Sequence, residues 1–198
     1  MSVERQGKRG EKFVENVRFV FEGIAFVGLN VPGSNNNRVL DAKDCANKSA
    51  RTLAQCEADN AEYIERDAAN IQWMQEAFAM AKERKAAGLV IVFQADPGFD
   101  LPETEEIDET KAPEFSGYRN FMDRMVAETE RYSGQVLMVH GDTHFFKIDM
   151  PLYSPPKLLR NFTRLQTFGS PSIHWVKVSV DPRRPRVFAL EPIIVKQN

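Results

Sequence analysis

The chain has 198 residues, with 42% hydrophobic and 27% charged residues, which is the composition of an ordinary globular domain. Its 26 Lys and Arg against 28 Asp and Glu give a formal net charge of −2. This balance disfavours a nucleic-acid-binding protein, because such proteins need a basic face. No apolar run approaches the roughly 20 residues of a membrane span. We therefore expect one domain with neither nucleic acid nor membrane as a partner.

The N-terminal segment is charged and lacks the apolar core of a secretory signal. Residues 1–14 are expected to be a poorly ordered leader, ahead of a domain over residues 15–198. The missing signal favours a cytoplasmic product if Met1 is the true start. If the true start lies upstream, Cys45 and Cys56 could form a disulfide instead of remaining free thiols, and both states stay open.

Two adjacent apolar runs near the start predict a β-hairpin. Residues 16–23 and 24–31 are rich in β-branched and aromatic residues, and a Glu-Gly pair lies between them. The second run is almost wholly apolar, which predicts a strand buried on both faces. It ends at a Pro-Gly pair, and residues 34–37 (Ser-Asn-Asn-Asn) then favour a turn.

The strongest helical pattern follows over residues 59–87. Residues 38–57, which precede it, have no clear period and are expected to be a long loop. Gly88 would end the helix, and residues 89–93 would form a short apolar strand. Apolar residues at steps of three and four predict one buried helical face, formed by Ile64, Ala68, Ile71, Met74, Phe78 and Ala81.

The second half repeats the alternation of helix and strand. An acidic loop over residues 100–113 precedes a helix over 115–132 and a buried strand over 136–139. A returning strand over 145–149 and three successive strands, expected to be antiparallel, complete the chain; those three cover 163–168, 173–180 and 187–190. The predicted fold class is α/β, with a mixed sheet flanked by at least two helices and an antiparallel C-terminal sheet.

Three potential metal ligands lie within five residues at the end of the strand over 136–139. They are His140, Asp142 and His144, and imidazole with carboxylate suits a Zn, Mn or Fe ion. Asp142 and His144 are separated by one residue, so in an extended stretch they would project to the same side. The alternative is a strand-to-turn corner in which Asp142 caps backbone amides.

Polar residues also follow two other predicted strands. Gln94 and Asp96 come after one strand, and Asn35 and Asn36 come after another. Because strand ends on one edge of an α/β sheet face the same crevice, Gln94 and Asp96 are expected to approach His140–His144. The amides of Asn35 and Asn36, together with Asp96, are candidate substrate contacts, although all three residues are also ordinary turn formers.

These pieces, in this order, resemble the C-terminal part of calcineurin-like metallophosphoesterases, from about Glu15 onward. Residues 26–30 resemble the strand after the family's Gly-Asn-His motif, and residues 89–94 resemble the strand that ends in a ligand His. Residues 141–144 (Gly-Asp-Thr-His) resemble the closing Gly-His-x-His motif. The resemblance implies a mixed β-sandwich flanked by helices, with its N-terminal part missing. It also implies two-metal hydrolysis of a small-molecule phosphoester with Mn, Fe or Zn.

The departures from the family pattern limit what this chain is expected to do alone. His144 matches a family ligand, whereas Asp142 and Gln94 each stand where a His is expected, and His140 lies beside them. The family's Asp-x-His, Gly-Asp and Gly-Asn-His motifs are absent. We therefore expect a partial metal site, no tightly bound metal, and weak or no activity. The alternative is a non-catalytic remnant that binds a partner, such as a second copy, through an exposed sheet edge.

Overall fold

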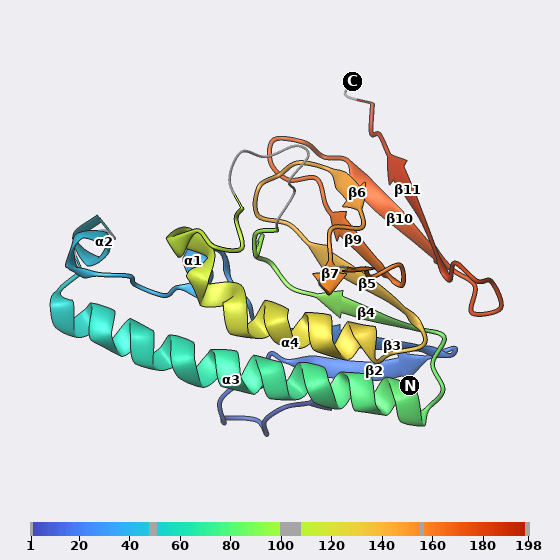
Figure 1. Cartoon of the computed structure of the whole chain (residues 1–198), viewed down its shortest axis with the longest axis horizontal. Helices are drawn as coiled ribbons and strands as arrows, with labels where there is room; N and C mark the ends of the chain where they lie inside the picture. The colour runs from blue at the N-terminus through green and yellow to red at the C-terminus, as the bar shows by residue number, and fades with distance from the viewer. Residues whose placement is uncertain (1, 48–50, 100–107, 155–156, 197–198) are drawn as a thin grey trace.

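The structure is a computed structural model that describes residues 2–47, 51–99, 108–154 and 157–196 (Figure 1). Within these residues a seven-stranded mixed sheet has the order β1-β2-β3-β4-β5-β9-β6. Strands β3, β4, β5 and β9 are parallel, and the others pair antiparallel with their neighbours. The strands are β1 (Glu4–Arg5), β2 (Val17–Phe21), β3 (Ile24–Gly28), β4 (Gly88–Val92), β5 (Gln135–His140), β9 (Phe162–Gln166) and β6 (Lys147–Asp149).

The predicted N-terminal hairpin is confirmed by strands β2 and β3. Glu22 and Gly23 turn between them with φ values of 46° and 79°, the left-handed conformation that tight hairpin turns require. The segment expected to be a leader contributes β1, which pairs with β2. Gln6 in the same segment donates a hydrogen bond from Nε2 to the carbonyl of Ala69 at 2.7 Å. This N-terminal segment therefore contacts the rest of the fold.

The long helix α3 (Leu53–Glu83) starts and ends earlier than the sequence predicts. Thr52 caps its first turn and forms a reciprocal capping box with Gln55, which fixes the start. The predicted loop over 38–57 is wrong, because it contains α2 (Ala42–Asn47) and the first turn of α3. A disulfide between Cys45 and Cys56 joins these two helices.

The buried face of α3 also differs from the predicted one. Ile64 is 66% exposed, so it does not belong to the core. The true face includes three polar residues, and their charge or amide groups hid the helical period from a count of apolar residues alone. The buried residues from Tyr63 onward are Tyr63, Arg66, Asp67, Asn70, Trp73, Met74, Ala77, Phe78 and Ala81.

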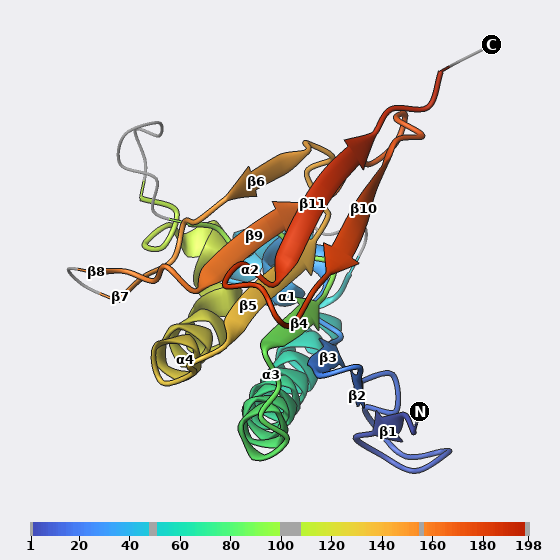
Figure 2. The same cartoon turned by 90° about the vertical axis from the view of Figure 1, so that its right-hand side faces the viewer.

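The second predicted helix consists of a 3₁₀ turn, η1 (Pro113–Tyr118), followed by α4 (Arg119–Glu130). Both α3 and α4 cover the same face of the sheet (Figure 2), and the main core lies between them and the strands. Phe93, which follows β4, meets Phe121 from α4 edge to face in this core, with the ring centroids 5.4 Å apart. Most of the predicted acidic loop, residues 100–107, lies outside the described residues.

The C-terminal strands are only partly as predicted. β10 (Trp175–Val180) and β11 (Phe188–Ile193) form the expected antiparallel hairpin, which covers part of the opposite face of the main sheet. The antiparallel prediction fails for β9, which pairs parallel to β5 and antiparallel to β6. In this inner position four of the five β9 residues are buried, including Arg164 and Gln166, so the strand does not show an interior strand's apolar run in its sequence. A short pair, β7 (Tyr153–Ser154) and β8 (Lys157–Leu158), precedes it.

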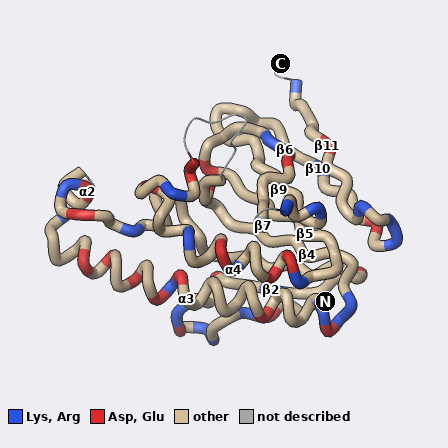
Figure 3. The backbone as a smooth tube through the Cα atoms, viewed as in Figure 1, with Lys and Arg blue, Asp and Glu red and all other residues tan. Residues whose placement is uncertain are grey.

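The mixed α/β class predicted from the sequence is confirmed by this arrangement. In the described part of the chain, no helix is both long and apolar enough to cross a membrane. Lys and Arg are interspersed with Asp and Glu along the backbone rather than gathered into one block (Figure 3).

Candidate functional site

The segments that follow β3, β4 and β5 meet at one edge of the sheet, because these three strands run parallel. Backbone hydrogen bonds continue the pairing beyond the strand ends. The amide of Ala95 donates to the carbonyl of Val31 at 3.1 Å, and the amide of Gly141 donates to the carbonyl of Gln94 at 3.1 Å. The segments that carry the predicted site residues are therefore held together by their own backbones.

A chain of hydrogen bonds centred on the Asp142 carboxylate links these segments. Oδ1 of Asp142 accepts from Nε2 of Gln94 at 2.8 Å, and its Oδ2 accepts from the amide of Asp96 at 3.3 Å. Oε1 of Gln94 in turn accepts from the amide of Gly33. The structure thus brings together Gln94, Asp96 and Asp142 from the predicted set, and it adds Gly33.

Gly33 and Asp142 are fitted closely to each other. A Cβ at position 33 would lie 2.8 Å from both carboxylate oxygens of Asp142, so only glycine leaves room for this contact. Asp142 has a φ of 77°, a left-handed conformation that aspartate tolerates better than most residues. Burial raises the pKa of the neighbouring Asp96, and a backbone hydrogen bond from Gly98 partly opposes that rise.

His144 is held by a different segment from the one that holds Asp142. Its Nδ1 lies 2.7 Å from the carbonyl oxygen of Ser170 and donates to it, because a carbonyl oxygen only accepts. The ring packs against Gly169, where a Cβ would come within 2.3 Å of the ring carbon Cδ2. The two residues of the predicted closing motif therefore have separate hydrogen-bond partners.

His140 lies below the site instead of at its surface. Its side chain is 1% exposed and stacks on Phe93 with the ring centroids 6.3 Å apart. Burial, with a smaller contribution from Arg164, lowers its pKa to about 4, so the imidazole is neutral at pH 7. Gln166 lies opposite His140 in the β5–β9 pairing and donates from Nε2 to Thr143. His140 thus belongs to the layer that supports the 141–144 segment.

Asn35 and Asn36 lie in the turn after β3, and both use their side chains within the protein. Oδ1 of Asn35 accepts from the amide of Gly117 at 2.6 Å. Asn36 is fully buried, and its Nδ2 donates to the carbonyl of Gly117 at 3.0 Å. Their hydrogen bonds tie the turn to η1.

The residues brought together do not fit a metal ion by themselves. Among the described residues, no three or more His, Cys, Asp or Glu side chains are grouped to hold a metal. Both carboxylate oxygens of Asp142 accept hydrogen bonds, and His144 is bound to another segment. Zinc sites in proteins use three or four side-chain ligands, more than these residues supply by themselves.

Asp67 has a shifted pKa and was not among the site residues predicted from the sequence. It lines a groove of about 650 Å³ between α3 and α4, together with Tyr63, Asn120 and Asp123. Burial raises its pKa to about 6, and Arg66 partly opposes that rise. The sequence did contain a signal for it, because Asp67 lies on the same helical face as the apolar residues Trp73 and Phe78. Burying a charged side chain is costly unless it has a partner or a role.

No family model matches the chain, and no curated protein matches it.

Proposed function

We propose that this chain contributes one part of a calcineurin-like, metal-dependent phosphoesterase site and has weak or no activity alone. The observation that carries the proposal is the hydrogen-bonded unit of Gly33, Gln94 and Asp142 where three parallel strands end. Ligands of open α/β sheets bind at this edge. Within this unit, Gln94 and Asp142 follow each other in the chain order of the two family motifs that residues 89–94 and 141–144 resemble.

In this proposal the chain's residues supply a minority of the ligands. A complete centre would use two Mn, Fe or Zn ions to activate a water molecule and stabilise the phosphoryl oxygens of a small phosphoester. Among the described residues, the two candidate ligands at this edge are Asp142 and His144, the latter through Nε2, which Ser170 does not engage. Gln94 orients Asp142 through a hydrogen bond. The remaining ligands would come from residues outside the described set, in the same polypeptide or in another one.

The proposal is tested by metal titration and by hydrolysis of an aryl phosphate with the purified chain. We expect Mn²⁺ and Zn²⁺ to bind weakly and to be lost on dialysis, with little or no turnover. His144→Ala and Asp142→Asn should abolish the residual binding, whereas His174→Ala, a matched histidine in the C-terminal region, should not. Two results would contradict the proposal: stoichiometric metal that survives dialysis, or weak binding that neither site variant changes.

The second candidate function is partner binding, with a second copy of the chain as the partner. The observation that favours it is the β10–β11 hairpin, which pairs with no other described strand and exposes Trp175 (52% exposed), Val178 and Val180. Open strand edges with apolar side chains promote association. A monomer at every concentration in sedimentation equilibrium would exclude this candidate.

A further inference from the structure

The turn that follows β3 is left-handed over four successive residues. Ser34, Asn35, Asn36 and Asn37 have φ values of 55°, 58°, 56° and 59°. The short element α1 (Gly33–Asn36) is therefore a left-handed turn. L-residues avoid this region because Cβ approaches the following carbonyl oxygen, and they visit it as single residues. Something in the surrounding structure must hold the turn in this conformation.

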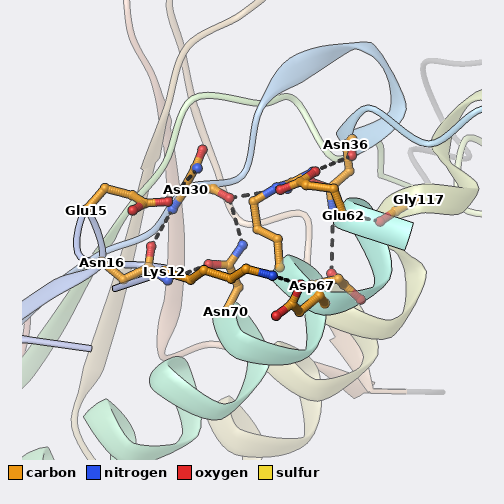
Figure 4. Close-up of polar contacts among 11 residues, drawn as sticks. Lys12, Glu15, Asn16, Asn30, Asn36, Glu62, Asp67, Asn70 and Gly117 are labelled. Atoms are coloured by element: carbon orange, nitrogen blue, oxygen red, sulfur yellow. Dashed lines mark hydrogen bonds and ion pairs between the residues drawn. The ribbon is translucent and has the colours of Figure 1, made fainter. Parts of the chain in front are cut away.

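The guanidinium group of Arg66, a residue of α3, contacts this turn at Asn36. Figure 4 shows the polar contacts around Asn30, Asn36 and Asn70. The side chain of Arg66 is 2% exposed. Its Nη1 donates to Oδ1 of Asn36 and, at 3.4 Å, to the carbonyl of Asn30, while its Nη2 donates to the carbonyl of Asn36 at 2.9 Å. Arg66 thus joins the segment that enters the turn to the residue in its middle. On the other side of the guanidinium, Nε of Arg66 donates to Oε1 of Glu62 at 2.6 Å.

Asparagine side chains extend these contacts to the neighbouring elements. Nδ2 of Asn70 donates to the carbonyl of Asn30 at 2.7 Å, and Oδ1 of Asn16 accepts from the amide of Asn30 at 2.8 Å. Asn36 reaches the carbonyl of Gly117 at 3.0 Å. Contacts from Asn16, which precedes β2, from α3 and from η1 therefore fix the turn and the segment that enters it. The guanidinium group of Arg66 binds the backbone of the turn directly.

We propose that Arg66 is a positioning residue that holds the left-handed turn and so sets where the Gly33 amide meets Gln94. Because Gln94 bonds Asp142, Arg66 acts on the candidate site without touching it. Without this fork of donors the turn would keep its contacts to Gly117 but lose those to α3, and we expect Ser34 to relax toward the right-handed region. The inference rests on the same site as the proposed function but requires no metal, substrate or reaction.

The direct test is Arg66→Lys followed by NMR. Lysine keeps the charge, but its single ammonium cannot reproduce the planar fork of donors. The amides of Asn37 and Arg38, which bond to the carbonyls of Ser34 and Asn35, should exchange about tenfold faster. The side-chain amide resonance of Gln94 should also shift. Glu62→Gln is the matched control, because it keeps an acceptor for Arg66, and it should change exchange by less than about twofold.

A glycine rescue separates positioning from general stability. Ser34 is exposed and has a φ of 55°, so Ser34→Gly removes the backbone penalty with little loss of contact. In the Arg66→Lys background it should restore slow exchange at Asn37 and Arg38 and return the Gln94 resonance. Three results would overturn the proposal: faster exchange spread evenly over all strands, an unmoved Gln94 resonance, or no rescue by glycine.

A second variant covers the case in which Arg66→Lys does not fold. Asn36→Ala removes the Oδ1 acceptor of Arg66 and the donor to Gly117 while leaving the buried guanidinium in place. It should give the same local acceleration at Asn37 and Arg38, and unchanged exchange there would overturn the proposal. None of these measurements involves phosphoester hydrolysis, so failure of the proposed function would leave this result intact, and the reverse also holds.

Discussion

Gly33 is the residue at which one added methyl group would disturb the candidate site. Its backbone does not have a positive φ, so alanine would meet no backbone strain. The obstacle is the Asp142 carboxylate, 2.8 Å from the added Cβ. Because the Asp142 side chain is exposed and can rotate away, Gly33→Ala should cost no more than about 1 kcal/mol of unfolding free energy. It should nevertheless break the hydrogen bond between Asp142 and Gln94, which the Gln94 side-chain resonance would report.

Gly141→Ala is the matched control for this substitution. Gly141 lies in the same site, but a Cβ there would meet its nearest neighbour, Oγ1 of Thr167, at an ordinary 3.6 Å. We expect the Gln94 resonance to stay in place in Gly141→Ala and to move in Gly33→Ala. An equal shift in both variants would mean that the resonance responds to any change in the loop and not to the carboxylate.

At the scale of elements, the sequence predicted the strands of the sheet better than the face of its longest helix. Strands β3, β4 and β5 are largely apolar runs of 5, 5 and 6 residues bounded by turn residues, a length that favours buried strands over helices. In α3 the buried face contains Arg66, Asp67 and Asn70. Their partners come from distant parts of the chain: Asn36 for Arg66, Asn36 and Asn120 for Asp67, and Asn16 and Asn30 for Asn70.

The candidate site, too, could be predicted from the sequence only in part. Convergence of the strand ends followed from the α/β pattern, and the structure has Gln94, Asp96 and Asp142 together at that edge. The hydrogen-bond partner of His144 could not be predicted from the motif. That partner, Ser170, lies far along the chain, and spacing within a motif cannot identify it. The close contact between Gly33 and Asp142 could not be predicted either, because it depends on how two loops approach each other.

The Cys45–Cys56 disulfide joins α2 to the start of α3 and yields a prediction about these elements. Both side chains are buried beside Val39, and few other contacts hold α2 to the fold. Replacing both cysteines by alanine should lower the unfolding free energy by about 2–3 kcal/mol, because a short loop is no longer closed in the unfolded chain. Amide exchange should accelerate in α2 before it does in the sheet. Intact mass with and without reductant checks the bond, and alkylation of both thiols without reductant would contradict it.

At the scale of the whole molecule, two buried titrating groups affect stability in opposite directions. The pKa of Asp67 is about 6, above its ordinary value of 3.8, so its contribution to stability is full below about pH 4 and is lost as pH rises through 6. The pKa of His140 is about 4, below its ordinary 6.5. Its contribution is present above about pH 6.5 and is lost as pH falls through 4. Between about pH 4 and 6 the two contributions change with pH in opposite directions and partly cancel.

Replacing one of these two residues at a time should reveal how the other makes the unfolding free energy depend on pH. Asp67→Asn keeps an acceptor for Asn36 but cannot ionise, so it should be more stable than the parent at pH 7, by about 1–3 kcal/mol. Its stability should then rise with pH from about 4 to 6.5, because the His140 slope is no longer opposed. In His140→Phe, which keeps a ring against Phe93, stability should instead fall over the same range. Urea unfolding followed by circular dichroism at several pH values measures both slopes. Parallel pH profiles for the parent and both variants would show that neither group titrates as its burial requires.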